Sequence, residues 1–258
     1  MLNFARRLVR RFLPRLSDPW LDAPVVPLPR DAAFEQAYAE SLLPFESSDP
    51  FLAARYREGA RWRQVLDRAG VRESRVLDIG SGSGAVGMAI GAGSNRAFTT
   101  DFIWNETARV AHRRAAAPYR HVIADAAALP FRDGAFDAVV CLEAIEHFPD
   151  APAAGAEASR VLRGGGAIVL ITPARLAWLF RPDPHFAIRG LLIFPPAIQR
   201  AIAARRGFGQ PHHFVDRIYT SSKQLERLFP RCRVARTMTR ARLPKRFFWD
   251  ALLLRKDR

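Results

Sequence analysis

The chain has 258 residues, of which 49% are apolar, so it suits one large domain with additions and is too apolar for general disorder. No apolar run reaches the roughly 18 residues that a membrane span needs, and two distant cysteines, Cys141 and Cys232, indicate neither a disulfide framework nor a zinc site. The net charge of +15 lies at the ends: residues 1–17 hold five arginines and no acid, and residues 181–258 hold eighteen basic and five acidic residues. Such a basic surface indicates an anionic partner, namely lipid headgroups, nucleic acid or a phosphorylated substrate.

The N-terminal part reads as a segment separate from the main domain. Residues 1–30 combine apolar residues at helical spacing, interleaved arginines and then a proline-rich linker, which predicts a basic amphipathic helix. Such a helix either lies on an anionic membrane surface or packs its apolar stripe on the domain, and both interpretations stay open. Further helices are predicted over 31–42 and 51–69, the second ending near Gly70.

From residue 71 onward, strand and helix patterns alternate, which predicts a parallel sheet with helices on both faces. The domain is expected to span 31–258, with a cofactor-binding core at about 71–173. Residues 174–217 are rich in Pro, Phe and Leu and too long for an ordinary connection, so they predict a cap over a ligand site or an extra helix on the core. The final stretch, about 232–254, predicts closing strands, and its apolar tail is expected to be a buried strand rather than a membrane patch. The core elements expected are strands at 75–79, 96–100, 121–124, 136–142 and 167–172, and helices at 84–92, 105–117 and 151–162.

A glycine-rich loop joins the first predicted strand to the following helix. Its sequence is Asp78-Ile-Gly80-Ser-Gly82-Ser-Gly84, in which the glycines allow a sharp turn and close approach to a ligand. The glycines alone also satisfy a permissive dinucleotide fingerprint. Asp78 disfavours a pyrophosphate, because a carboxylate beside the loop suits a cation, such as the ammonium and sulfonium of S-adenosylmethionine. The alternative is a structural turn in which Asp78 is a cap.

Polar residues also follow the later strands, where ligands of open α/β sheets bind. Asp101 ends the second strand, 23 residues after Asp78, close to the spacing at which an acid meets ribose hydroxyls; its alternative role is a helix cap. Asp125 follows the third strand and can accept a hydrogen bond from an exocyclic adenine amine. The fourth strand ends in Leu142-Glu143-Ala-Ile-Glu146-His147.

The order VLDIGSGSG, Asp101, DAAALPF, FDAVVCLEAIEHF and VLRGGGAIVLITP resembles class I S-adenosylmethionine-dependent methyltransferases, especially the ubiquinone-biosynthesis branch of small-molecule methyltransferases. The resemblance covers about residues 55–175. It implies an α/β, Rossmann-like, seven-stranded, mostly parallel sheet with the last strand antiparallel, N-terminal helices, and a cap after the fifth strand. By motif match, the cofactor S-adenosyl-L-methionine would be held by Asp78, Gly80, Gly82, Gly84, Asp101, Phe102, Asp125, Ala126 and Leu142.

Methyl transfer to a hydroxyl needs a placed nucleophile and a base. His147 lies at the predicted methyl site, while His185, His212 and His213 lie in the predicted cap; each is otherwise a polar loop histidine. Glu143, Glu146 and His147 are adjacent, but their spacing is not diagnostic of a metal, and we expect none.

These features predict a cytoplasmic methyltransferase, peripheral at the inner membrane face if its basic ends bind lipid. The expected reaction is O-methylation of a small-molecule, lipid-linked or glycan-type acceptor. The first alternative is an RNA methyltransferase, disfavoured because no RNA-binding module is evident and Leu142-Glu143-Ala144-Ile145 stands at the edge after the fourth strand. The second is a cofactor-binding protein without transferase activity. A dehydrogenase is disfavoured further by Asp78.

Overall fold

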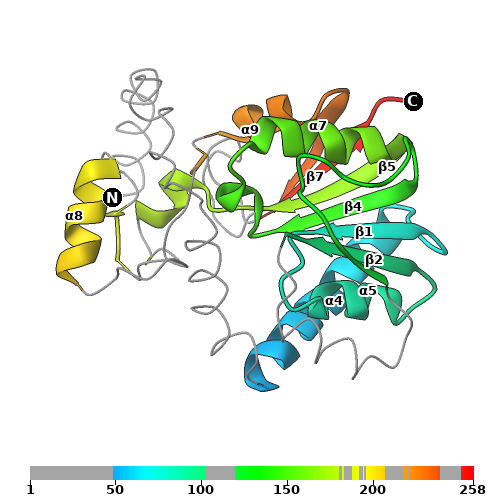
Figure 1. Cartoon of the computed structure of the whole chain (residues 1–258), viewed down its shortest axis with the longest axis horizontal. Helices are drawn as coiled ribbons and strands as arrows, with labels where there is room; N and C mark the ends of the chain where they lie inside the picture. The colour runs from blue at the N-terminus through cyan, green and yellow to red at the C-terminus, as the bar shows by residue number, and fades with distance from the viewer. Residues whose placement is uncertain are drawn as a thin grey trace, which may run out of the picture.

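The computed structural model describes residues 49–102, 120–179, 196–206, 221–238 and 251–258, together with a few positions between 182 and 219. Its centre is a seven-stranded sheet in the order β3-β2-β1-β4-β5-β7-β6 (Figure 1). β7 is antiparallel to both of its neighbours, and the remaining pairs are parallel, so the predicted α/β fold with an antiparallel last strand is confirmed. The strands are β1 (Arg75–Ile79), β2 (Arg96–Asp101), β3 (Arg120–Ile123), β4 (Phe136–Leu142), β5 (Leu162–Ile171), β6 (Cys232–Met238) and β7 (Ala251–Lys256).

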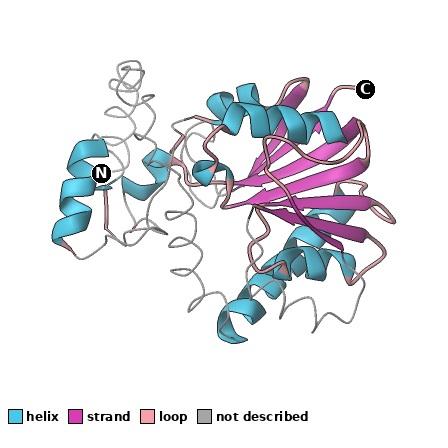
Figure 2. Ribbon diagram, in the orientation of Figure 1, coloured by secondary structure: helices cyan, strands magenta, loops and turns pink. Residues whose placement is uncertain are grey.

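Helices cover both faces of the sheet, giving three layers (Figure 2). One face packs on α4 (Asp49–Arg68) and α5 (Ala85–Gly91), which contribute Trp62, Leu66, Val86 and Ile90 to the core. The other face packs on α7 (Ala151–Val161) and α9 (Ser222–Leu228). Because successive strand residues point to opposite faces, β1 sends Leu77 and Ile79 toward α7 and α9, and sends Val76 and Asp78 toward α4 and α5.

Helix and strand ends follow local chemistry. α4 ends where Gly70 takes a positive φ of 81° and the Val71 amide donates to the Leu66 carbonyl at 2.9 Å, the arrangement of a glycine C-cap. α9 begins after Ser221, whose amide donates to the Gln224 side chain. β5 begins at Leu162, before the strand predicted at 167–172, and residues 163–166 form an irregularity in its pairing with β4, where Gly165 takes a φ of 70°.

The segment after β5 leaves the carboxyl ends of the parallel strands and leads through η2 (Arg175–Leu179) to α8 (Pro196–Arg205), the yellow helix beyond that edge (Figure 1). The apolar end of the chain is a buried strand: Leu252 and Leu254 of β7 are fully covered, as the sequence predicted. Residues 1–48 and 103–119 lie outside the described residues, and with them the predicted helices at 2–16, 31–42 and 105–117. Within the described part, no helix is both long and apolar enough to cross a membrane.

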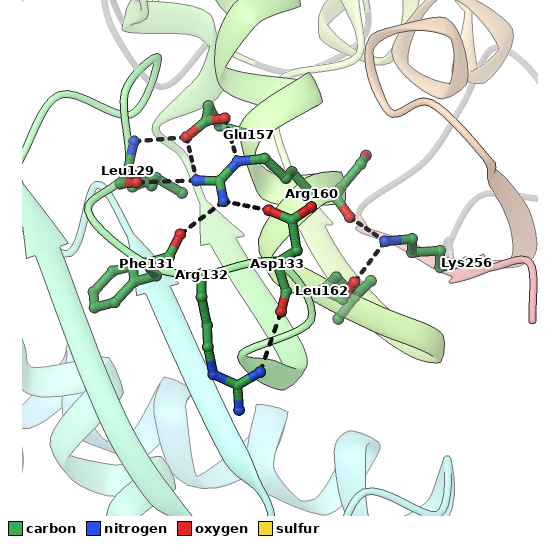
Figure 3. Close-up of polar contacts among 9 residues, drawn as sticks. Leu129, Phe131, Arg132, Asp133, Glu157, Arg160, Leu162 and Lys256 are labelled. Carbon is green, nitrogen blue, oxygen red and sulfur yellow. Dashed lines mark hydrogen bonds and ion pairs between the residues drawn. The ribbon is translucent and has the colours of Figure 1, made fainter.

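Arg160 of α7 fixes the loop that leads into β4 (Figure 3). Its guanidinium donates to both carboxyl oxygens of Glu157, to the Leu129 and Phe131 carbonyls, and to Asp133, at 2.6–3.0 Å. Glu157 in turn accepts from the Leu129 amide at 2.8 Å. This network lies near the first residues of β4 and β5, at the opposite edge of the sheet from the glycine loop.

Candidate functional site: the carboxyl edge of the sheet

The glycine loop after β1 is held by the end of β2. The amides of Gly80 and Ser81 both donate to the Thr100 carbonyl, at 2.9 and 3.0 Å, and the Gly82 amide donates to Asp101 Oδ2 at 2.8 Å. Gly80, Gly82 and Gly84 have φ values of 68°, 50° and 73°, a region that side chains rarely adopt. The loop is therefore rigid and depends on glycine at three positions.

Close packing adds a second requirement for glycine in this loop. A Cβ atom at Gly80 would lie 2.5 Å from the Ala144 Cβ, which follows β4. The loop thus sits directly against the end of β4, leaving no room for a side chain between them.

Asp78 is a buried carboxyl group at the base of the loop. Asp78 is 3% exposed, and its Oδ2 has no hydrogen-bond partner among the described residues. Burial raises its pKa to about 7, the nearby Arg55 lowers it, and Asp101 raises it. A carboxyl group in this state is stabilised by a positively charged ligand and not by a phosphate.

The ends of β2 and β3 form the next part of the edge. Asp101 pairs in register with Ile123, and the Ala124 amide donates to the Asp101 carbonyl at 3.0 Å. Phe102 and Ile123 are 56% and 57% exposed, which is unusual for large apolar side chains at neighbouring strand ends. Asp125 is exposed, and its Oδ1 accepts from the Ala127 amide at 2.8 Å, which fixes the turn that includes Ala126.

The chain after β4 carries two carboxyl groups in different settings. Leu142 is buried, and Glu143 takes a φ of 54° while its amide donates to the Ile171 carbonyl of β5. Glu146, in the short helix η1 (Ile145–His147), is fully buried. Neither of its carboxyl oxygens makes a well-formed hydrogen bond within the described ranges. Burial raises the pKa of Glu146 to about 8, and weaker hydrogen bonding from its own backbone and from the Thr172 side chain lowers it.

Arg55 of α4 brings a positive charge to this edge. Its Nη1 lies 2.6 Å from Glu58 Oε2 and 3.2 Å from Glu143 Oε2. It also lowers the pKa of both Asp78 and Glu146. One guanidinium therefore acts on carboxyl groups from α4, β1 and the segment after β4.

The structure gathers most of the predicted cofactor residues at this single edge. The loop after Asp78 reaches Asp101 through the Gly82 amide, Leu142 ends the adjacent strand, and half-buried His147 follows in η1. His185, His212 and His213 lie outside the described residues. Within the part of the chain that is described, no three His, Cys, Asp or Glu side chains cluster as metal ligands would.

Sequence reasoning missed two features of this edge. It did not select Arg55, and it did not predict that Glu146 is buried. Arg55 is one of five arginines in α4, so spacing along that helix could not select it. Glu146 was noted only as part of a polar run. The available signal of its burial was the apolar pair, an alanine and an isoleucine, directly before it.

A parallel sheet with this strand order, an antiparallel closing strand and a glycine loop above a buried acid define the class I methyltransferase fold. Residues 77–170 match the family model described as "Methyltransferase domain". Demethylmenaquinone methyltransferase of Thermus thermophilus is 34% identical over 154 residues, covering 55% of this chain and 63% of the relative. Malonyl-[acyl-carrier protein] O-methyltransferase of Geobacter sulfurreducens is 32% identical over 121 residues, covering 46% of this chain and 45% of the relative. The chain thus spans less than two thirds of the length of either relative.

Solved structures agree on the fold. The 1,6-didemethyltoxoflavin-N1-methyltransferase of Burkholderia thailandensis, solved with 1,6-didemethyltoxoflavin and S-adenosylhomocysteine, has a TM-score of 0.57 at 16% identity and covers 92% of this chain and 95% of its own. The PH0226 protein of Pyrococcus horikoshii also gives 0.57 at 16% identity, covering 83% and 94%. The predicted resemblance is confirmed: residues 77–170 match a methyltransferase domain, and the chain has the fold of a solved methyltransferase.

Proposed function

We propose that the protein transfers a methyl group from S-adenosylmethionine to a small-molecule acceptor. The observation that carries this proposal is the buried Oδ2 of Asp78, which has no hydrogen-bond partner among the described residues and lies beneath a loop whose Gly80 has no room for a side chain. This site suits a ligand that is cationic at its reacting end and lies close to backbone. When bound, the cofactor supplies an electrophilic methyl group on a sulfonium and leaves as a neutral thioether.

The other residues of the edge have complementary roles in this proposal. Asp101 is placed to accept from the ribose hydroxyls, since its carboxylate already anchors the Gly82 amide beside the loop. Phe102 and Ile123 cover the two faces of the adenine, which accounts for their exposure at neighbouring strand ends. Asp125 and Ala126 read the adenine edge, and Leu142 forms the floor beneath the cofactor.

His147 is the base that we propose for an O-methylation. It is half-buried and lies at the carboxyl end of β4, next to the loop that holds the methionine end. Its role is to take the proton of the acceptor hydroxyl as the oxygen attacks the methyl group. His147→Ala should lower kcat by roughly 10²- to 10⁴-fold with cofactor affinity nearly unchanged; a loss below about threefold would leave positioning alone as the mechanism.

The acceptor that we favour is lipid-linked and is met at an anionic membrane surface, with residues 174–217 as the cap of the acceptor site. Phe194 and Ile198, the second on α8, are 41% and 44% exposed, and Arg205 and Arg206 at the end of that helix are exposed as well. Apolar and basic side chains together suit the headgroup region, and the basic ends of the chain add to this attraction. Co-sedimentation with phosphatidylglycerol vesicles should therefore weaken with salt and fall when residues 1–17 are deleted; binding indifferent to both would contradict it.

The experiment that tests the proposal is calorimetric titration of the purified protein with S-adenosylmethionine, S-adenosylhomocysteine and NAD. We expect either adenosyl ligand to bind at about micromolar Kd or tighter. Asp101→Ala should weaken it by about 1–3 kcal/mol while the fold survives, since a charged acceptor is lost. Tighter binding of NAD would overturn the assignment.

A further inference from the structure

The amino ends of the parallel strands carry a second charged surface, at the end of the sheet opposite the glycine loop. β7 is antiparallel to its neighbours, so its last residues and the first residues of β6 lie at this end as well, at the right of Figure 1. Six of the seven strands have an arginine here, within two residues of the strand terminus. These arginines, which we call the arginine edge, are the exposed Arg75, Arg96, Arg120, Arg163 and Arg233 and the half-buried Arg255.

Two pairs of these arginines face each other across neighbouring strands. Arg75 of β1 is the register partner of Arg96 of β2. Arg233 of β6 is the register partner of Arg255 of β7. Like charges at directly opposite positions destabilise a sheet. The fold therefore holds positive charge on both sides of the central β4–β5 pair at a cost in stability, which an anionic ligand would offset.

The carboxylates near the middle of the arginine edge are already engaged. Asp133 is paired with Arg160 at 2.8 Å. Asp137 is shared between Arg163, at 2.6 Å, and Arg75, at 3.9 Å. One carboxylate thus faces two guanidinium groups, and positive charge remains in excess.

Farther out along the edge, the arginines have no carboxylate partner among the described residues. Arg96 forms no ion pair with them, and Arg233 donates to the Cys232 carbonyl at 3.1 Å. Arg255 donates to the Gly165 carbonyl at 3.3 Å. Because a guanidinium stays charged throughout the physiological pH range, these side chains remain available to an anion.

Apolar side chains are missing from the described part of this edge. The exposed large apolar residues that the structure describes lie on the N-terminal half of α4, at the carboxyl ends of β2 and β3, and in or just before α8. The arginine edge therefore has no ring on which the bases of a single strand can stack. It also has no apolar anchor of the kind on which stable protein complexes depend, and no side chain that inserts among lipid tails.

We propose that the arginine edge binds the phosphate backbone of a double-stranded nucleic acid without reading its sequence. Across the seven strands, six steps of about 4.8 Å make a row of roughly 29 Å, close to one turn of a duplex at about 34 Å. The planar fork of arginine matches two phosphate oxygens at once. A duplex carries one phosphate charge per about 1.7 Å of its axis, so several phosphates lie within reach of such a row.

This docking is separate from methyl transfer. The glycine loop lies at the other ends of the same strands, and α8 lies beyond them (Figure 1). A duplex on the arginine edge leaves the cofactor site open, so it is a docking partner and not the methyl acceptor. A flat bilayer that contacts α8 cannot also contact the arginine edge, because the two surfaces lie at opposite ends of the sheet.

The test measures the binding of a fluorescein-labelled DNA duplex of about 20 base pairs to the full chain by fluorescence anisotropy, between about 50 and 200 mM salt. We expect a Kd on the order of 1–100 µM near physiological salt, with affinity falling as salt rises. Arg96→Gln combined with Arg233→Gln should weaken binding about threefold to tenfold. It should also reduce the slope of log K against log salt by roughly two, because two phosphate contacts are lost. The melting temperature should not fall, since each substitution removes one member of a like-charge pair.

The matched control is Arg57→Gln combined with Arg61→Gln, which removes the same charge from exposed positions on α4. It should change duplex affinity by less than about twofold and keep the wild-type salt slope. Equal losses in the two double variants, or a wild type that does not bind the duplex at low salt, would overturn the proposal.

Three competing probes distinguish the other anionic partners. A single strand that binds more tightly than the duplex would overturn the assignment to double-stranded nucleic acid. So would poly-glutamate that displaces the duplex more effectively than unlabelled duplex does, since it would assign the arginine edge to an acidic protein. Binding of phosphatidylglycerol vesicles that is lost in the Arg96 and Arg233 double variant, with duplex binding unchanged, would assign it to a membrane. The proposed function is tested separately by cofactor calorimetry, because neither pair of substituted arginines lies at the glycine loop.

Discussion

The two ends of the parallel strands differ in how completely their charged side chains are paired. At the amino ends of β4 and β5, Arg160 makes hydrogen bonds with all three guanidinium nitrogens, and its partners Glu157 and Asp133 are paired in return. At the carboxyl ends, Asp78 and Glu146 are buried more deeply, yet Asp78 Oδ2 has no hydrogen-bond partner in the described chain and the Glu146 oxygens make no well-formed hydrogen bond there. The charged groups around Arg160 at the amino ends are hydrogen-bonded to one another, whereas the two acids at the carboxyl ends lack such partners among the described residues.

The incomplete pairing at the carboxyl ends lowers the stability of the fold and indicates a ligand site there. A buried polar group without a partner costs about 1–3 kcal/mol, more for a charged one, so these two acids reduce stability. Burial raises the pKa values of both acids toward neutrality. A ligand that brings positive charge to this edge would supply the missing interaction, and perturbed acids are common at such sites for that reason.

The largest expected effect is at Gly80. Gly80→Ala combines an unfavourable positive φ with a clash against Ala144, so it should lower the free energy of unfolding by about 2–5 kcal/mol and weaken the cofactor at least tenfold. Urea unfolding and calorimetry measure the two effects.

Gly70→Ala separates strain from packing, because Gly70 also has a positive φ but no atom lies within 4 Å of the place that a Cβ would occupy. It should lose only about 1–2 kcal/mol and bind normally. Equal losses in both variants would mean that the neighbours of Gly80 yield and that the loop is less tightly packed than the structure indicates.

The next prediction concerns the hydrogen-bond network of Arg160 at the amino ends of β4 and β5. Arg160→Met removes its hydrogen bonds but keeps its length, and should lower the free energy of unfolding by about 2 kcal/mol, since the side chain is 31% exposed and partly screened. Cofactor affinity should not change. Arg163→Met is the control, because Arg163 meets Asp137 at the same edge but is 50% exposed, and it should lose less than about 1 kcal/mol.

The Arg160 effect should also depend on pH. The hydrogen bond from Arg160 lowers the pKa of Glu157 below its ordinary value of 4.5. An acid with a lowered pKa stabilises the fold above its unfolded value and loses that contribution as the pH falls through the folded value. The stability gap between wild type and Arg160→Met should therefore narrow below about pH 4.5; a gap constant down to pH 3 would contradict this pairing.

Glu146 is expected to show the opposite pH dependence. Its pKa rises from 4.5 to about 8, so the folded protein holds a proton that the unfolded chain releases. The contribution of Glu146 to stability is then greatest below pH 4.5 and falls as the pH rises toward 8. Glu146→Gln, which stays neutral, should lose this fall and become more stable than wild type at pH 9 by about 1–3 kcal/mol.

The matched variant is Glu73→Gln, at an exposed position, which should follow the wild-type curve throughout. Urea midpoints from pH 5 to 9 measure all three proteins. Asp78 contributes equally to each, so the difference between the curves reports Glu146. Parallel curves for wild type and Glu146→Gln would show that Glu146 has partners beyond those the described residues provide.

Much of the sheet and the loop could be predicted because their signals are local. β1 and β4 follow mainly apolar runs with clear ends, and the glycines mark the turn that needs positive φ. The contributions of Arg55 and Glu146 could not be predicted, because they depend on contacts between distant segments. Arg55 meets Glu143 across 88 positions, and Glu146 is buried only once the end of β5 closes beside it.

The smallest expected effect, a fraction of a proton, tests most directly why the carboxyl edge is incomplete. Asp78 has a pKa of about 7 and faces Arg55 and Glu58 from α4 and Asp101 from β2. A cationic ligand lowers that pKa, so at pH 7 binding should release roughly half a proton, an amount that falls at pH 9, where Asp78 is already ionised. Calorimetry in phosphate and in Tris buffers measures the release, because the two buffers differ in ionisation enthalpy.

Asp78→Asn should weaken the binding of S-adenosylmethionine by about 1–3 kcal/mol and reduce the proton release. Glu146→Gln, in contrast, should keep the part of the proton release that is present at pH 7 and lost at pH 9. Proton release unchanged in Asp78→Asn would show that the ligand's charge is met elsewhere, and the unpaired oxygen beneath the glycine loop would then need a different partner.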